Sequence, residues 1–367
     1  MRALVTGANG FLGKNLQAHM REKEIEAVLF TRDMSEEQMP RCLEDVDFVF
    51  HLAGVNRPKD TAEFVSGNKE LTEQLCEAIR ASGRKIPVIY TSSIQAEADN
   101  LYGASKRAAE EALVSLESNT GSPVYIYRLP NVFGKWSRPN YNSAVATFCY
   151  NIANDLEIKI SDPATTIRLV YVDDVIADFL KLFSGRPTGA LRPEIETIYT
   201  ISVGNLADQI RAFKGSRESM ITEPVGAGLT RALYSTYLSF LRPEQFSYSL
   251  PQYEDPRGLF VEILKTRDSG QFSFFTAHPG VTRGGHYHHS KNEKFLVIQG
   301  KARFGFRHIV TGETYELFTD GVKLEVVETV PGWSHDITNI GSNKMIVMLW
   351  ANEIFNQQRP DTISHKV

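Results

Sequence analysis

The sequence predicts two domains of different class, an α/β domain on a parallel sheet followed by an all-β domain. Over residues 1–245, short apolar runs alternate with longer helical patterns, which is typical of parallel strands joined by crossover helices. From residue 246 to 367, short β-rich runs are separated by Gly, Pro, Asn and Asp turns, which indicates an antiparallel sandwich or barrel. Seven of the nine histidines lie after residue 270, so the two parts also differ in composition.

The individual elements follow from the same patterns. The least readable stretch is 184–245, where we expect one helix around 205–213. The first part has a helical pattern at 104–116, and its strands are expected at 3–5, 28–30, 48–52, 88–90 and 125–127. In the second part, strands are expected at 272–276, 294–298, 302–306, 324–327 and 345–350.

Composition limits the classes of function. The chain has 367 residues with 40 basic and 44 acidic side chains, which suits two globular domains and argues against nucleic acid as the main partner. Three widely spaced cysteines with no CxxC pair predict a reducing compartment. No apolar run reaches the ~18 residues of a membrane span, and the first strand begins at once, without a signal-peptide pattern. We therefore expect a cytoplasmic protein without membrane insertion.

A glycine-rich loop, TGANGFLG, follows the first strand and precedes a helical pattern. Glycines at these positions allow a tight turn, backbone approach to a pyrophosphate at a helix N-terminus, and close helix–strand packing. A flexible turn is the alternative for a glycine loop alone, but the strand–turn–helix context predicts a dinucleotide site. Its expected cofactor contacts are Gly7, Asn9, Gly10, Phe11, Leu12 and Gly13.

The end of the second strand bears on whether the cofactor is NAD or NADP. An NAD enzyme usually has Asp or Glu there to bind the ribose hydroxyls, whereas this chain has Arg32. A guanidinium suits the additional 2′-phosphate of NADP, so Arg32 predicts NADPH, with a surface arginine as the alternative.

Tyr102 and Lys106 are four residues apart at the start of a helical pattern, which places them on one helix face. A free tyrosine has a pKa near ~10, so it acts at neutral pH only where a neighbouring cation stabilises its phenolate. Ser93, at a strand end, is placed to hydrogen-bond a substrate carbonyl. An exposed helix face is the alternative for such a pair. After a dinucleotide loop, however, the pattern predicts Ser93, Tyr102 and Lys106 as a catalytic set.

These motifs resemble the extended short-chain dehydrogenase/reductase family, with further similarity in DFVFHLAG, RLPNVFG and YVDD, from residue 1 to about 180. The resemblance implies a Rossmann-like doubly wound sheet and a nucleotide-sugar substrate. It also implies cofactor contacts from Leu52, Ala53 and Gly54 as well as from Tyr102 and Lys106. The candidate substrate contacts are Asn131, Lys135, Arg138 and Asn142, although a solvated loop is nearly as good an explanation for each.

The second part contains a pattern typical of a metal site. His286 and His288 are two residues apart and share one side of a strand, while His289 points away. Glu293 and His335 are expected to complete the ligand set from neighbouring strands. Imidazole nitrogens and one carboxylate suit Zn²⁺, Fe²⁺, Mn²⁺ or Ni²⁺.

This pattern is similar to the two motifs of the cupin family, which implies a jelly-roll domain. The second motif departs from the family because Pro331 directly precedes Gly332 and Glu325 replaces an expected glycine. Upstream, DPRGLFVE resembles a run of nucleotide-sugar epimerases in the same superfamily, which implies nucleotide contacts from Arg257, Phe260 and Glu262. A turn followed by a strand with a salt bridge is the alternative for that run.

The whole chain resembles the CapF-type family of bifunctional capsular polysaccharide enzymes, through SSIQ, PNYN, HYHHSKNEKFL and WANE. The resemblance implies a homodimer and two reactions on a UDP-2-acetamido-2,6-dideoxy-4-hexulose. A zinc cupin would epimerise carbon 3, and the reductase domain would then reduce carbon 4 with NADPH. The implied product is UDP-2-acetamido-2,6-dideoxy-L-talose, in the UDP-N-acetyl-L-fucosamine pathway for capsule or O-antigen. The residues alone support an NADP-dependent keto reduction plus a metal-assisted step.

Two other functions fit parts of the sequence. One is a monofunctional NADPH-dependent 4-keto-sugar reductase whose cupin is structural and dimerising. The other is a nucleotide sensor with an inactive reductase site, which the intact Ser-Tyr-Lys set argues against. The sequence does not rank the candidate bases for the epimerase reaction, which are Lys294, Tyr287, His289 and Asp336.

Overall fold

The structure is a computed structural model that describes residues 1–58, 60–185, 191–250, 252–255, 258–261, 264–266, 270–353 and 358–367. It divides into two compact units, each built from two stretches of chain. The first contains Met1–Ser143 and Ile167–Thr200, and the second contains Ala144–Thr166 and Ile201–Val367. The expected boundary between residues 245 and 246 follows the change in residue pattern, and it stays a prediction.

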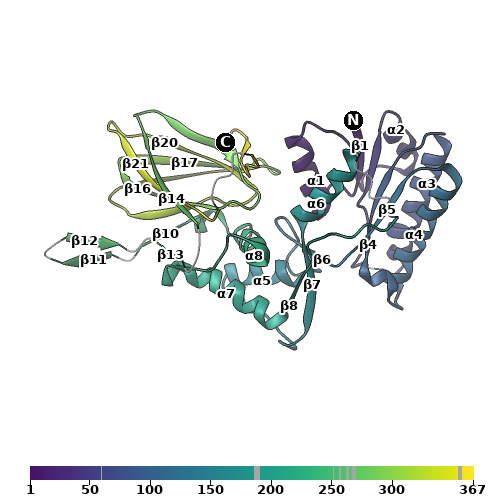
Figure 1. Cartoon of the computed structure of the whole chain (residues 1–367), viewed down its shortest axis with the longest axis horizontal. Coiled ribbons are helices and arrows are strands. Elements are labelled where there is room, and N and C mark those ends of the chain that lie inside the picture. Colours follow the sequence, from purple (N-terminus) through teal and green to yellow (C-terminus); the bar gives the residue numbers. More distant parts are fainter. Residues whose placement is uncertain are drawn as a thin grey trace. The chain divides into compact units, whose positions relative to one another are not determined.

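The first unit is built on a five-stranded parallel sheet in the order β2-β1-β3-β4-β5 (Figure 1). Its strands correspond to the five runs that the sequence predicts, except that β3 ends at His51, one residue before the predicted end. They are β1 (Arg2–Thr6), β2 (Glu26–Phe30), β3 (Phe48–His51), β4 (Val88–Ser93) and β5 (Val124–Leu129). A second, smaller sheet contains β6 (Asn131–Phe133), β7 (Thr166–Tyr171) and β8 (Tyr199–Ser202).

Helices cover both faces of the parallel sheet, because both faces of its strands are apolar (Figure 1). In β3, Val49 packs in the core under α3 and α4, while Phe48 and Phe50 contact Phe183 of α6 on the opposite face. This arrangement confirms the predicted doubly wound fold. The helical segments are α1 (Phe11–Glu22), η1 (Glu36–Gln38), α2 (Met39–Leu43), η2 (Val65–Glu70), α3 (Leu71–Ala81), η3 (Ile94–Glu97), α4 (Leu101–Thr120) and α6 (Val172–Phe183).

The second unit contains a sandwich of two antiparallel sheets, drawn green to yellow in Figure 1. One sheet has the order β10-β19-β16-β21-β14, with β10 (Ser247–Ser249), β19 (Glu325–Glu328), β16 (Glu293–Gln299), β21 (Met345–Ala351) and β14 (Gln271–Ala277). The other has the order β18-β17-β20-β15-β22, with β18 (Thr314–Asp320), β17 (Lys301–His308), β20 (Trp333–Asn339), β15 (Thr282–Tyr287) and β22 (Ile363–Ser364). The sandwich confirms the predicted all-β class.

Aromatic side chains fill the space between the two sheets. Phe295 of β16 lies 5.7 Å, between ring centroids, from Phe304 of β17, and Phe246 lies 5.3 Å from both Phe306 and Trp333. Two two-stranded sheets complete the β-structure among the described residues. One pairs β11 (Gln252–Asp255) with β12 (Gly258–Val261) in antiparallel orientation, and the other pairs β9 (Ile221–Thr222) with β13 (Lys265–Thr266) in parallel orientation.

A buried cluster of charges joins helices of the second unit to the outer face of the β10-β19-β16-β21-β14 sheet. Glu328 of β19 is 1% exposed and forms ion pairs with Lys294 of β16 and Arg217 of α7. The Lys294 ammonium also donates to the Tyr248 hydroxyl at 3.2 Å. These contacts explain why the second unit includes residues before 246, and its helical segments are α5 (Ala144–Ala153), α7 (Val203–Ser219), α8 (Gly228–Leu238) and η4 (Pro243–Gln245).

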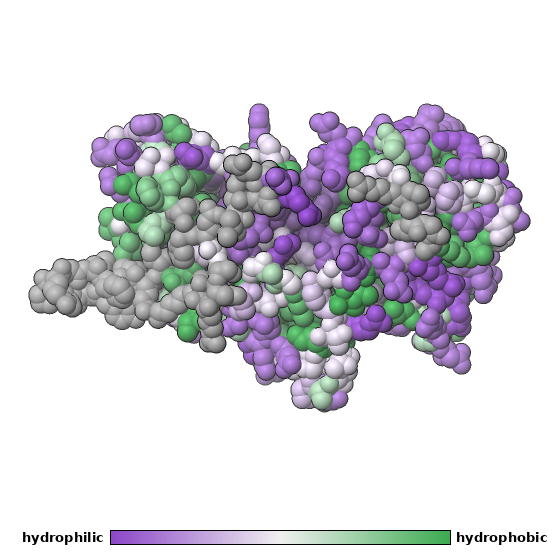
Figure 2. Space-filling model, in the orientation of Figure 1, coloured by the Kyte–Doolittle hydropathy of each residue, from purple (hydrophilic) through white to green (hydrophobic). Residues whose placement is uncertain are grey.

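The surface is largely hydrophilic in the view of Figure 2, with hydrophobic residues over parts of the sandwich. Exposed apolar side chains there include Phe274, Ile298, Phe318 and Val322. In the described part of the chain, no helix combines the length and the apolar character that crossing a bilayer requires. The three cysteines are buried and unpaired, as the sequence predicts.

The buried ion cluster gives a stability prediction. Replacing Glu328 by Ala leaves Lys294 and Arg217 buried without their carboxylate, which should lower the free energy of unfolding by about 3–5 kcal/mol. The matched control is Glu316→Ala, since Glu316 forms an exposed pair with Arg303 and should contribute less than about 1 kcal/mol. Urea unfolding followed by tryptophan fluorescence measures both, because Trp333 and Trp350 report on the second unit. Equal effects of the two substitutions would contradict the argument.

Candidate dinucleotide and metal sites

The glycine loop of the first unit has a geometry that only glycine permits. Gly7 has φ +67°, and a Cβ there would lie 2.7 Å from the Ala53 nitrogen, at the end of β3. A Cβ on Gly13 would lie 2.4 Å from the Gly7 carbonyl oxygen. The loop can therefore hold the start of α1 directly against β1 and β3.

The start of α1 is suited to bind an anion. Gly10 is the N-cap residue, and the first turn of the helix carries no acidic side chain. The backbone N–H groups and the helix dipole at such a position favour a phosphate. Of the predicted contacts in the loop, Asn9 and Gly10 are exposed, and Phe11 and Leu12 are half-buried.

The other predicted cofactor contacts lie at the same edge of the sheet. Thr6 pairs with Phe30 of β2 and with His51 of β3, so all three strands end at the glycine loop. Arg32 is exposed two residues beyond β2, and residues 52–54 directly follow β3. A Cβ on Gly54 would lie 3.0 Å from the Lys106 Nζ atom, so the lysine reaches this edge from α4.

The predicted catalytic side chains meet where β4 ends and α4 begins. Ser93 is the last residue of β4, and its side chain hydrogen-bonds Tyr102. The first turn of α4 is fixed by Asn100, whose side-chain oxygen accepts from the Gly103 nitrogen at 2.8 Å. The Lys106 ammonium donates to the Thr91 carbonyl at 3.0 Å and to the Tyr90 hydroxyl at 3.2 Å.

The pKa values of this set are strongly affected by burial. Burial raises the pKa of Tyr102, and the hydrogen bond with Ser93 partly lowers it. Burial also lowers the pKa of Lys106 to about 8, although the charge of Glu110 raises it. In the structure the Lys106 ammonium is directed to Thr91 and Tyr90, and the expected lowering of the Tyr102 pKa by Lys106 stays a prediction.

Sequence reasoning missed Glu110, which fixes α4, the helix of the predicted catalytic residues Tyr102 and Lys106. Glu110 is 2% exposed, and its carboxylate accepts from Arg128 Nη2 at 2.6 Å and from the Ser92 hydroxyl at 2.5 Å. It lies four residues after Lys106 and therefore on the same face of α4. That spacing was the available signal. By binding β4 and β5 together, Glu110 keeps Tyr102 and Lys106 beside Ser93.

The predicted substrate contacts differ in accessibility. Lys135 is 1% exposed and its Nζ lies 2.7 Å from an Asp173 carboxylate oxygen, so its charge is already paired. Asn131, Arg138 and Asn142 are exposed, and the Arg138 guanidinium lies over the ring of Tyr141. All four stay predictions as substrate contacts.

The structure describes the side chain of none of the three predicted nucleotide contacts in the second unit. Arg257 and Glu262 are not among the described residues, and Phe260 is described only as part of strand β12.

The four predicted metal ligands come together in the second unit. The ligand atoms of His286, His288, Glu293 and His335 all lie within 4.8 Å of one another. The Glu293 Oε2 atom lies 3.3 Å from the His288 Nε2 atom and 3.5 Å from the His335 Nε2 atom. A single cation placed among these atoms could contact all four side chains.

The fold positions the ligands in a way that differs in part from the expectation. His286 and His335 are direct partners on the paired strands β15 and β20, and a β-bulge after Gly284 brings His286 into that register. Glu293 was expected on a strand next to those of the histidines. Instead it begins β16, a strand of the facing sheet. The site therefore spans the space between the two sheets. In the second motif, Gly332 has φ +87° directly before β20, a backbone conformation that favours glycine.

The chemistry of these side chains fits a cation. His335 is buried, and neither of its ring nitrogens has a hydrogen-bond partner among the described residues. Burial lowers the pKa of His286 to about 4, with further lowering by His335 and His288. Burial would raise the pKa of Glu293, but the neighbouring His288 and His335 rings lower it well below its usual value. Neutral imidazoles beside an ionised carboxylate are the forms that bind metals.

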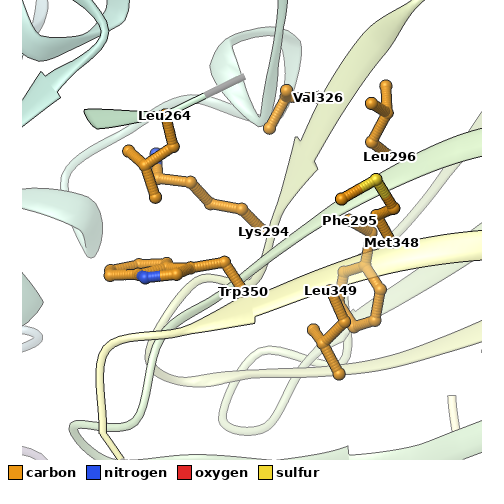
Figure 3. A pocket seen from close by; sticks show the side chains of 8 residues that line it. All are labelled: Leu264, Lys294, Phe295, Leu296, Val326, Met348, Leu349 and Trp350. Carbon is orange, nitrogen blue, oxygen red and sulfur yellow. The ribbon is translucent and has the colours of Figure 1, made fainter. Parts of the chain in front are cut away.

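None of the four candidate bases belongs to this ligand cluster. Lys294 follows Glu293 and faces the outer side of the sheet, where it lines a small apolar pocket with Leu264 and Trp350 (Figure 3). Its pairing with Glu328 holds the Lys294 pKa well above the usual value despite burial, which favours the protonated ammonium over the free base. Asp336 is paired with Arg303 at 3.0 Å. Tyr287 and His289 pack against each other, with ring centroids 5.5 Å apart.

Sequence reasoning also missed Lys291, on the loop between His288 and Glu293. Its Nζ lies 2.9 Å from Glu293 Oε1, the oxygen on the other side of the carboxylate from the imidazoles. Lys291 can therefore orient the carboxylate while Oε2 remains directed at the histidines.

Comparison with known proteins defines the class. The model of the NAD dependent epimerase/dehydratase family matches residues 3–189, and the model of the polysaccharide biosynthesis C-terminal domain matches residues 253–363. Together with the fold and the two sites, these matches define a chain in which a dinucleotide-binding α/β domain is joined to a cupin-like β domain.

Similar proteins are known along the whole chain. A UDP-2-acetamido-2,6-beta-L-arabino-hexul-4-ose reductase of Pseudomonas aeruginosa is 62% identical, over 100% of this chain and 99% of that protein. A crystal structure of the capsular polysaccharide assembling protein CapF from Staphylococcus aureus is 41% identical over 100% of both chains, with a TM-score of 0.68. This chain belongs to the CapF-type family of capsular polysaccharide biosynthesis enzymes.

A more distant likeness concerns the fold alone. The UDP-glucuronic acid 4-epimerase of Bacillus cereus in complex with NAD is 22% identical over 59% of this chain and 84% of that one, with a TM-score of 0.53.

The close packing at Gly13 gives a prediction for the dinucleotide site. In Gly13→Ala the added methyl group collides with the Gly7 and Ala8 carbonyl oxygens, so the loop must move, at a cost of about 1–3 kcal/mol. We expect NADPH or NADH binding to weaken by about tenfold or more, measured by fluorescence titration. The control is Gly215→Ala in α7, where a Cβ would meet no atom within 4 Å. Unchanged dinucleotide affinity in Gly13→Ala would show that this loop does not carry the site.

Proposed function

We propose that this chain is a bifunctional nucleotide-sugar enzyme. Its cupin domain epimerises carbon 3 of a UDP-2-acetamido-2,6-dideoxy-4-hexulose with the help of a metal, and its first domain then reduces the carbon 4 ketone with NADPH. The product is UDP-2-acetamido-2,6-dideoxy-L-talose, in the UDP-N-acetyl-L-fucosamine pathway for capsule or O-antigen. The observation that carries the proposal is the presence, in one chain, of a Ser-Tyr-Lys set beside a dinucleotide loop and a cluster of three histidines and one glutamate. The name of the Pseudomonas relative, a 4-keto-sugar reductase, supports the reductive half.

In the reduction, Tyr102 donates a proton to the ketone oxygen while Ser93 hydrogen-bonds the same oxygen and orients it. NADPH, when bound, supplies the hydride. Because burial raises the pKa of Tyr102, the phenol stays protonated at neutral pH and is available as a donor. Lys106 lies beside Gly54 at the cofactor edge, where its charge favours the phenolate that remains after proton transfer. Arg32 supports NADPH over NADH, since its exposed guanidinium suits a 2′-phosphate.

In the epimerisation, His286, His288, Glu293 and His335 hold a divalent metal, for which zinc is our first choice because the resemblance to the CapF-type family implies it. The same donors suit other divalent metals. A metal held there supplies Lewis-acid stabilisation of the negative charge that develops on a substrate oxygen as the proton beside the ketone is removed. Lys291 keeps the Glu293 carboxylate oriented, and Phe295, 6.1 Å from His335 between ring centroids, limits the access of water from the core side.

One observation favours the second candidate, a monofunctional reductase with a structural cupin. His288, Glu293 and His335 are each at most 5% exposed, as in metal sites that only stabilise a fold. His286 is more accessible, which is what a site open to substrate requires. Loss of the folded sandwich on metal removal would favour the structural role.

We further propose that the enzyme works as a homodimer in the cytoplasm. Exposed Phe274 and Phe318 on the sandwich support a contact with another chain, since such side chains gain stability when they are covered. The sugar nucleotide is the expected partner molecule of both sites.

The two reactions can be separated by substitution in the first domain. Tyr102→Phe removes the proton donor but keeps the ring, so reduction should fall by about 10²–10⁴-fold. Exchange of solvent deuterium into the UDP-4-keto-6-deoxy-N-acetylhexosamine, which reports proton removal beside the ketone, should continue without NADPH. NADPH consumption and mass spectrometry in D₂O measure the two rates. Reduction at the original rate would show that Tyr102 is not the donor.

The opposite separation is expected in the second domain. His288→Ala removes one metal ligand, so zinc binding should weaken by more than about 100-fold and deuterium exchange should stop. Reduction of an already epimerised keto sugar should persist. The control is His278→Ala, because His278 is exposed and is not part of the cluster. Exchange that continues unchanged in the metal-free variant would leave the metal of the cupin a purely structural role.

A further inference from the structure

The last residues of the chain return to the metal cluster. Strand β22 pairs antiparallel with β15, so Ser364 lies opposite His286 and Ile363 lies opposite Tyr287. The His365 nitrogen donates to the Gly285 carbonyl at 2.9 Å. Residues 358–367 therefore form the edge of the sheet next to a strand that carries a predicted ligand, which places Asp361 beside the loop that follows this strand.

The side chain of Asp361 binds three consecutive backbone amides of that loop. Its Oδ1 atom accepts from the His289 nitrogen at 2.9 Å, and its Oδ2 atom accepts from the Ser290 nitrogen at 2.7 Å and from the Lys291 nitrogen at 2.8 Å. The Ser290 hydroxyl donates to the same Oδ2 atom at 3.1 Å. Four hydrogen bonds to one carboxylate fix the backbone of residues 289–291, which lies directly between the ligands His288 and Glu293.

The backbone of Asp361 acts on His288 itself. The Asp361 carbonyl oxygen is hydrogen-bonded to the His288 Nδ1 atom. Because a carbonyl oxygen can only accept, Nδ1 carries the proton, so in the neutral ring the lone pair that can bind a metal is on Nε2. The Nε2 atom is the one that lies 3.3 Å from the Glu293 carboxylate and faces the cluster.

We infer that Asp361 is a positioning residue of the metal site, which holds the 288–291 loop and selects the metal-binding tautomer of His288. The inference rests on the proposed function, since it requires that the cluster binds a metal. Asp361 lies 73 residues after His288, so the C-terminal segment is a part of the site. Partners that orient a ligand in this way typically change metal affinity by about 10–100-fold when they are replaced.

The test uses the full chain after metal removal. Asp361→Asn keeps the size of the side chain but places an NH₂ group against backbone N–H donors, so zinc affinity should fall by about 10–100-fold in competition with a chromophoric chelator. The matched control is Asp320→Asn, because Asp320 also accepts from two backbone amides, those of Val322 and Lys323, in a turn after β18. We expect the control to bind zinc as the unchanged protein does.

Two further measurements distinguish positioning from general stabilisation. The ¹⁵N chemical shifts of His288 should show the Nδ1-protonated tautomer in the metal-free protein. In Asp361→Asn they should show a mixture of tautomers, because loss of the side-chain bonds to the loop lets the backbone carbonyl of residue 361 move away from Nδ1. The visible spectrum of bound Co²⁺ should change in Asp361→Asn but not in Asp320→Asn. A variant that melts at a lower temperature yet, while folded, keeps the zinc affinity and the tautomer would overturn the inference.

A separate variant tests whether the cluster binds a metal at all. The variant His335→Gln removes a ligand and should abolish tight zinc binding. If the unchanged protein and His335→Gln bind zinc equally weakly, the proposed metal site is wrong. If His335→Gln loses zinc while Asp361→Asn keeps full affinity, the metal site stands and only the role of Asp361 is wrong.

Discussion

Strand β16 shows the constraint on which the second unit depends, the alternation of side chains across a β-sheet. Glu293 and Phe295 face the space between the sheets, where they meet His335, while Lys294 faces the outer side and pairs with Glu328. A shift of the strand by one residue would place the lysine among the imidazoles and the carboxylate against the helices. The same register thus builds a site for a cation on one face and an anchor for α7 on the other.

The two buried carboxylates, those of Glu328 and Glu293, have different partners. Glu328 has two cationic partners, Lys294 and Arg217, so its charge is balanced within the protein. Glu293 contacts one ammonium group through Oε1 and turns Oε2 toward the His288 and His335 rings, and burial lowers the pKa of His335. A carboxylate oxygen that faces ring nitrogens is an arrangement that a metal ion would complete. This difference supports the assignment of a structural role to the first and of metal binding to the second.

The sequence predicts what depends on neighbours along the chain and misses what depends on contacts across the fold. The strand–glycine–helix pattern locates Gly7 and Gly13, and four-residue spacing pairs Tyr102 with Lys106, because both are local geometries. The origin of Glu293 in the facing sheet could not be predicted, since no short pattern encodes which sheet a strand joins. Asp361 shares no motif with the loop it holds, and its role depends on the return of the C-terminal segment.

In the proposed function, chemistry sets the order of the two reactions. The proton on carbon 3 is acidic only while carbon 4 is a ketone, because the enolate places the negative charge on that oxygen. Once Tyr102 has donated its proton and hydride has been transferred, carbon 4 carries a hydroxyl and the neighbouring proton can no longer be removed. A reductase faster than the epimerase would therefore trap the wrong stereoisomer. Selectivity of the Ser93–Tyr102 site for the epimerised sugar is the simplest protection, since it allows the metal-assisted equilibrium to be drawn forward without releasing an incorrect product.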